Sequence, residues 1–194
     1  MKKMIAELRL SLLAVLSLAV ILCGLYPAAV WILAQGLFPA KANGSLIVRS
    51  GATLGSRLIA QGFIGPKYFH PRPSAAGQGY DAASSGGSNL GPTSKKLTDA
   101  VRRRITDYRA ENNLAPETAV PADAVTTSAS GLDPHISLNN ALLQMRRVAR
   151  ARGLGETALR KLVKACTKGR DLGILGEPRV NVLMLNLALD GTLK

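Results

Sequence analysis

The chain has 194 residues, with 25 basic and 12 acidic side chains, a net charge of +13, two histidines and two cysteines. Two cysteines, Cys23 and Cys166, exclude a disulfide framework, and the positive charge suits anionic lipid, nucleic acid or an acidic protein without choosing among them. A structural zinc site normally needs four nitrogen or sulfur ligands, and only His70, His135 and Cys166 lie outside the uncharged N-terminal run. We therefore predict no metal site and no intrinsic cofactor.

Residues 10–40 carry no charge over 31 consecutive positions. About 20 apolar residues cross the hydrocarbon layer as a helix, so this run predicts a transmembrane anchor over residues 10–38, with the span itself at about residues 10–33. Gly24 and Pro27 fall inside the span, where an irregularity facing lipid is costly but a kink packed against a neighbouring helix is tolerated. The competing interpretation is a cleaved signal peptide, whose apolar region normally has about 7–15 residues. A run about twice that length favours an uncleaved anchor.

Charges before the anchor predict its orientation. Residues 1–9 contain Lys2, Lys3 and Arg9 against Glu7, and an excess of basic residues favours the cytoplasmic side. The short tail 1–9 is therefore expected in the cytoplasm, and residues 39–194 are expected outside it.

Residues 39–194 are enough for one domain with its own core. The apolar spacing predicts a single N-terminal transmembrane helix plus one soluble α+β domain. Its expected elements are a strand at 45–48, a short helix or strand packing Leu54, Leu58 and Ile59 inward, a long Pro- and Gly-rich loop at 65–93, helices at 94–112, 138–152 and 156–168, a short strand at 123–127, and a buried central strand at 179–190.

Polar residues and glycines predict where the helices begin and end. Thr93 or Ser94 can cap the first helix, and the Asn112-Asn113 pair can end it. Ser137 can cap the second, Gly153 can end it, and Gly169 can end the third.

The loop around Ser88 lacks a hydrolase motif. Residues 86–90 (GGSNL) miss the final glycine of the G-x-S-x-G elbow, and residues 93–96 (TSKK) miss the serine of S-x-x-K. Small residues over 84–92 can instead expose backbone N–H groups to an anion such as a phosphate, just before a helix begins. A structural turn explains the same glycines equally well, and the chain has no G-x-x-x-x-G-K-[ST] phosphate loop.

The remaining candidates have simple structural interpretations. Asp133 before Pro134 is typical of a helix cap or turn, and His70 in its loop is expected to be packed or hydrogen-bonded. Between residues 146 and 170, nine basic residues accompany one acid, Glu156, without interleaved aromatic residues. This pattern favours a solvated or lipid-facing surface over nucleic acid.

Four motifs, in the same order, resemble the C-subunit family, KdpC, of the bacterial Kdp potassium-transporting ATPase: residues 68–74 (YFHPRPS), 85–92 (SGGSNLGP), 130–137 (SGLDPHIS) and 175–181 (LGEPRVN). The resemblance implies an inner-membrane complex in which a channel-like A subunit carries potassium, a P-type ATPase B subunit hydrolyses ATP, and a small F subunit accompanies them. It implies that this chain is an accessory subunit and not itself an enzyme, and that it acts as a catalytic chaperone raising the ATPase subunit's affinity for ATP.

The motif residues are the expected working or docking face. Partner or ligand contact is expected at His70, Arg72, Ser88, Asn89, Asp133, His135, Glu177 and Arg179, and nucleotide contact is expected at Gly86, Gly87, Ser88 and Asn89. The predicted orientation conflicts with nucleotide contact, because a domain outside the cytoplasm does not meet ATP.

Two other functions remain open. A free-standing, membrane-anchored binding module of the extracytoplasmic space predicts a stable monomer in detergent. A hydrolase predicts that a defined activity is lost when Ser88 is mutated.

Overall fold

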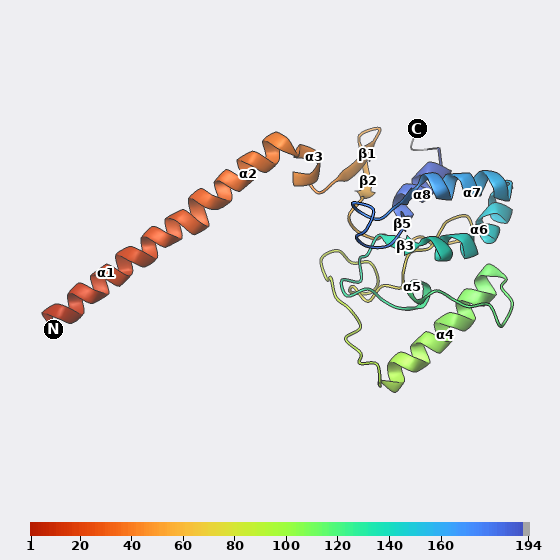
Figure 1. Ribbon diagram of the computed structural model, residues 1–194, viewed down its shortest axis with the longest axis horizontal. Coiled ribbons are helices and arrows are strands. Elements are labelled where there is room, and N and C mark those ends of the chain that lie inside the picture. The colour runs from red at the N-terminus through yellow and green to blue at the C-terminus, as the bar shows by residue number, and fades with distance from the viewer. Residues whose placement is uncertain (192–194) are drawn as a thin grey trace. The chain divides into compact units, whose positions relative to one another are not determined.

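The computed structural model describes residues 1–191, which divide into two compact units with a boundary between Leu46 and Ile47 (Figure 1).

The N-terminal unit is a continuous helical run. It consists of α1 (Lys2–Ala19), the π-helical segment η1 (Val20–Leu25) and α2 (Tyr26–Leu37), and the short helix α3 (Pro39–Ala42) follows. Lys2–Leu37 is 36 residues long and is the one helix, among the residues described, that is long and apolar enough to cross a membrane. This confirms the predicted single apolar N-terminal helix. The irregularity in this run is the π turn, which contains Gly24 and directly precedes the turn of α2 that holds Pro27.

The second unit mixes helices with two small sheets. β1 (Leu46–Arg49) pairs with β2 (Ala52–Ser56), and β3 (His135–Ser137), β5 (Arg179–Asn181) and β4 (Thr167–Lys168) form an antiparallel sheet in that order. Val180 lies opposite both Ile136 and Thr167. The helices are α4 (Lys95–Asn112), α5 (Ala122–Val125), α6 (Leu138–Arg152), α7 (Glu156–Ala165) and α8 (Val182–Leu189). The predicted α+β class is confirmed.

The main core lies between α6, α7, α8 and the three-stranded sheet. Its buried side chains come from these elements and from one residue of the long loop: Phe69, Ile136, Ala141, Met145, Val148, Ala149, Leu159, Val163, Val180, Val182 and Leu185. Because α6 supplies its apolar face to this core and its polar face to the loop, it is the central support of the domain.

The predicted caps of α4 and α6 are confirmed. The Ser94 hydroxyl accepts from the Leu97 N–H at 3.4 Å, and the Ser137 hydroxyl accepts from the Asn140 N–H at 3.1 Å. Asn113 and Gly153 end these helices with left-handed φ angles of 52° and 65°. Each cap satisfies backbone groups that the helix itself leaves open.

Four sequence predictions are wrong in detail. The end of the chain is not one buried strand, because after the three residues of β5 the Asn181 side chain caps α8 by accepting from the Met184 N–H at 3.1 Å. Residues 123–127 contribute to the short helix α5 rather than a strand. The third helix ends at Ala165 and not at Gly169, because the chain enters β4 at Thr167. Leu58, expected inside, is 60% exposed just after β2.

Candidate functional site

The first part of the long loop is held by two buried amide side chains. Asn186 of α8 accepts from the Phe69 N–H and donates to the Phe69 carbonyl, both at 2.9 Å. Gln144 of α6 does the same for His70, at 2.7 and 3.0 Å. Both amide side chains are nearly inaccessible to solvent. They complete the backbone hydrogen bonds of a segment that belongs to no strand, which is why a chain rich in proline is ordered here.

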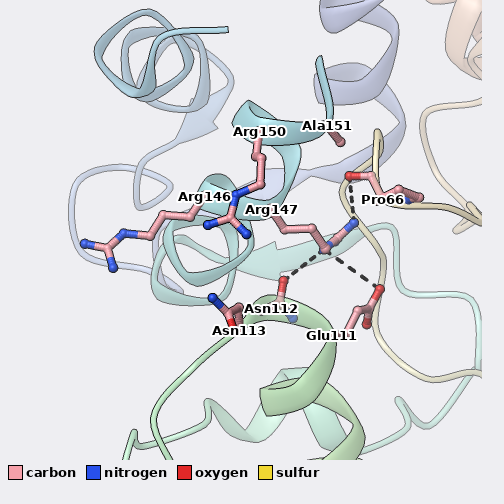
Figure 2. A pocket seen from close by; sticks show the side chains of 8 residues that line it. All are labelled: Pro66, Glu111, Asn112, Asn113, Arg146, Arg147, Arg150 and Ala151. Atoms are coloured by element: carbon pink, nitrogen blue, oxygen red, sulfur yellow. Dashed lines mark hydrogen bonds and ion pairs between the residues drawn. The ribbon is translucent and has the colours of Figure 1, made fainter. Parts of the chain in front are cut away.

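Arg147 of α6 reinforces the same segment. Its Nη1 donates to the carbonyls of Pro66 and Tyr68 at 3.0 and 2.9 Å, and its Nε donates to Asn112 Oδ1 at 3.0 Å. Figure 2 shows Arg147 reaching toward Pro66, Asn112 and Glu111 at one edge of a cavity of about 300 Å3. The guanidinium therefore ties the loop to α4 and α6, and nothing in the sequence pattern predicted this role.

His70 lies within the clamped segment. Its Nδ1 is 2.8 Å from Glu111 Oε1 of α4, and its Nε2 is 2.9 Å from the Gly65 carbonyl. The hydrogen bond from His70, aided by the nearby charges of His70 and Arg147, lowers the pKa of Glu111 despite its partial burial. Both ring nitrogens of His70 face acceptors, so this residue joins the loop to α4.

A second group of motif residues lines one open groove of about 560 Å3: Arg72, Asp133, His135, Glu177 and Arg179. The structure thus brings five of the eight predicted contact residues together from three segments of the chain. We call this the motif groove.

Asp133 is the charged centre of one side of the motif groove. Arg72 Nη1 donates to Asp133 Oδ2 at 2.9 Å, and the His135 N–H donates to Asp133 Oδ1 at 3.0 Å. Burial alone would raise the pKa of Asp133, but the hydrogen bonds from His135 and Arg72 outweigh it and lower that pKa to about 2. Of the two predicted roles of the Asp133-Pro134 pair, a turn into β3 is the one observed, since α6 begins only at Leu138.

Arg72 has one buried donor without an acceptor among the described residues. Its Nη2 donates to the Thr127 carbonyl at 3.3 Å, whereas its buried Nε has no acceptor within residues 1–191. A buried donor without a partner is uncommon in folded proteins.

The other side of the motif groove has its own ion pairs. Arg170 Nη2 contacts both carboxylate oxygens of Glu177 at 2.9 Å, and Arg179 Nη2 contacts Asp171 Oδ2 at 2.7 Å. Glu177 and Arg179 therefore pair with Arg170 and Asp171 and not with each other through their side chains.

The Gly86-Gly87-Ser88-Asn89 segment lies outside the motif groove. The Gly86 N–H donates to the Ser130 carbonyl at 2.9 Å, and a side chain at Gly87 would come within 3.0 Å of the Ala129 carbonyl. These glycines let two loops approach each other, while Ser88 and Asn89 are exposed. The close packing supports the structural-turn interpretation of the glycines.

Gly131 lies in the second of these two loops and also allows their close approach. Its φ is +67°, and a Cβ there would lie 2.6 Å from the Gly86 carbonyl oxygen and 2.7 Å from the Ala76 nitrogen. Only glycine fits both the backbone conformation and the space.

The hydroxyl groups that line the motif groove already donate hydrogen bonds to other groups of the chain. Thr126 Oγ1 donates to the Ala122 carbonyl at 2.7 Å, and Ser137 Oγ donates to Asp123 Oδ1 at 2.9 Å. Neither is paired with His135, as an activated nucleophile would be. Within residues 1–191, no three His, Cys, Asp or Glu side chains gather as they would around a metal ion.

Fold and site together define an α+β protein with one helix long enough to cross a membrane and a second unit that presents a charged groove. The chain belongs to the KdpC family, the K+-transporting ATPase c chain, whose family model matches residues 8–191.

Its relatives cover nearly the whole chain. A potassium-transporting ATPase KdpC subunit of Koribacter versatilis is 57% identical over 89% of this chain and 88% of its own length. A subunit of the same name from Rhodopseudomonas palustris is 55% identical over 97% of this chain and 98% of its own. Another from Mycobacterium tuberculosis is 57% identical over 85% and 87%.

Proposed function

We propose that this chain is an accessory, non-catalytic subunit that assembles and stabilises an ATP-driven potassium import complex. Its partners would be a channel-like A subunit, a P-type ATPase B subunit and a small F subunit. The observation that carries the proposal is the family match over residues 8–191, which includes both the exposed apolar helix and the motif groove. The engaged hydroxyls of the groove agree with a role in binding rather than in hydrolysis.

The apolar helix would join this chain to the membrane part of the complex. None of the side chains of α1 and α2 is buried within the chain, so their packing partners must be lipid or other helices. We place residues 1–9 in the cytoplasm, residues 10–38 in the bacterial inner membrane and the following domain outside, on the charge pattern of the tail.

The motif groove would be the docking face of the outer domain. Arg72, Asp133 and His135 offer donors and acceptors at one side, and Glu177 and Arg179 offer them at the other. His70 would act from within, by fixing the loop that leads to Arg72.

A finer proposal, that the chain raises the ATPase subunit's affinity for ATP, depends on orientation. Contact with nucleotide through Gly86, Gly87, Ser88 and Asn89 requires the domain to face the cytoplasm, contrary to the placement above. We therefore favour assembly over nucleotide contact.

Co-purification tests the proposed function. The chain, tagged after Lys194, is extracted from its native membrane in mild detergent, and ATP hydrolysis is measured with and without potassium. Recovery of a P-type ATPase and a channel-like protein with potassium-stimulated turnover is expected. Recovery of a lone, inactive monomer would overturn the proposal and favour a free-standing binding module.

Orientation is tested by labelling a single cysteine. Ile64 is 92% exposed, so Ile64→Cys in a background with Cys23→Ser and Cys166→Ser gives one accessible thiol on the outer domain. A membrane-impermeant maleimide should label it in intact spheroplasts. Labelling only after lysis would place the domain in the cytoplasm.

Nucleotide contact is tested on the assembled complex. The KM for ATP is compared between the wild type, Ser88→Ala with Asn89→Ala, and the control Ser84→Ala in the same loop. We expect the same KM for ATP in all three proteins. A higher KM in the Ser88 and Asn89 variant alone would support nucleotide contact.

A further inference from the structure

The connection between β4 and β5 contains a tight turn whose apolar side chains are exposed to solvent. Leu172, Ile174 and Leu175 are 88%, 76% and 55% exposed. Asp171 and Leu175 form an isolated bridge, in which each N–H donates to the other residue's carbonyl, at 2.8 and 2.9 Å. Residues 171–175, which we call the hairpin tip, therefore have a fixed shape although their apolar side chains gain little contact within the chain.

Leu172 is held in an unfavourable backbone conformation. Its φ of +53° lies in the left-handed region, which glycine and asparagine adopt far more readily than a bulky residue. Since Leu172 is also almost fully exposed, no burial within this chain offsets that strain. An outlier of this kind points to a contact outside the chain.

The charges at the base of the hairpin tip are already paired with one another. Asp171 Oδ1 contacts Lys168 Nζ at 2.8 Å, Asp171 Oδ2 contacts Arg179 at 2.7 Å, and Glu177 contacts Arg170 at 2.9 Å. A bilayer surface attracts unpaired lysines and arginines, whereas here every cation has a carboxylate beside it. These three cations share two carboxylates, so a protein surface that supplies one acidic side chain can cover this base without leaving a charge unpaired.

We propose that the hairpin tip docks Leu172 and Ile174 into an apolar pocket on the extramembrane surface of a partner subunit. This inference rests on the proposed function, because it takes the partner from the same ATPase complex. Arg179 lines the motif groove and pairs with Asp171 of the tip at 2.7 Å, so the tip lies beside the groove. An apolar centre beside polar contacts is the usual anatomy of a protein interface, and a rigid tip binds with little loss of conformational entropy.

Paired variants test the tip in the assembled complex. Leu172→Asn with Ile174→Ser removes both apolar side chains, and Ile64→Ser removes an equally exposed one elsewhere in the domain. The tip variant should recover about tenfold less ATPase after detergent washing than the wild type or the Ile64 control. Its full-length chain should melt at the same or a higher temperature, because asparagine tolerates the φ of position 172. Equal recovery from all three proteins would overturn the proposal.

Photo-cross-linking identifies what the tip touches. Benzoylphenylalanine is placed at position 172 and, as the control, at position 64. An adduct with another subunit at position 172 alone is expected. An adduct with lipid or with a second copy of this chain would overturn the proposal in favour of that occupant. If the wild-type chain recovers no ATPase, the proposed function fails together with the tip proposal. If the wild-type chain recovers the ATPase but the tip variant and the cross-link give negative results, only the tip proposal fails.

Discussion

Replacing Asn186 with alanine should destabilise the domain far more than the loss of a small polar side chain suggests. Asn186 is fully buried and holds both backbone polar groups of Phe69 at 2.9 Å. Alanine would leave that N–H and that carbonyl in the core without a partner. Each such group costs about 1–3 kcal/mol, so we expect a loss of roughly 2–6 kcal/mol. Domains are stable by only about 5–15 kcal/mol, so this is a large fraction of the total.

Thermal unfolding of the full-length chain in detergent measures this loss. The Asn186→Ala protein should melt at least about 5 °C below the wild type, while Asn139→Ala, at an exposed position of α6, should change stability by no more than about 0.5 kcal/mol. Trypsin should cleave after Lys67 faster in the Asn186 variant, because the loop loses one of its clamps. Unchanged melting together with unchanged cleavage would refute the idea that this amide orders the loop.

Three further changes have defined outcomes. Asp133→Asn should make the free energy of unfolding depend less on pH below about pH 4. The folded pKa of Asp133, about 2, lies below that of an unfolded aspartate, so the carboxylate stabilises the domain by about 2 kcal/mol above about pH 4. This stabilisation is lost as the pH falls toward 2. Urea unfolding at several pH values measures this, and identical curves would contradict it. Gly131→Ala should lower the free energy of unfolding by more than about 2 kcal/mol, and Gly153→Ala should lower it by about 1 kcal/mol. Both glycines have positive φ, but only a Cβ at position 131 would meet backbone atoms. Equal urea midpoints for the two variants would contradict this packing argument. Ser137→Ala should cost about 1–2 kcal/mol in the same assay through loss of a cap and of the bond to Asp123, and Ser137→Thr should retain most of that stability.

Helices whose own capping residues mark both ends could be predicted from the sequence. Elements whose type depends on packing against the rest of the domain could not. α4 and α6 begin at Ser94 and Ser137 and end at Asn113 and Gly153, as local capping chemistry requires. α8 is apolar on all sides, so its sequence has no period that separates a buried helix from a buried strand. The side-chain cap at Asn181 was the available signal for a helix.

The candidate site was predictable as a set of residues but not as an arrangement. The Arg72–Asp133 ion pair joins positions 61 residues apart in the sequence. No local pattern predicts that these two residues meet or that Ser88 lies outside the motif groove. The buried amides were missed altogether. Asn186 is the single polar residue in the apolar run of α8, and such an isolated amide in a buried helix signals a hydrogen bond to the backbone of another segment.

The π turn in the apolar helix changes which of its sides can face the same neighbour. An additional residue in a helical turn rotates everything beyond it by about 100°, so a stripe of side chains running along α1 does not continue along α2. One straight partner helix could follow either stripe but not both. The two halves of the membrane segment therefore present separate surfaces at different depths, and a single spanning helix can join two different neighbours in the bilayer.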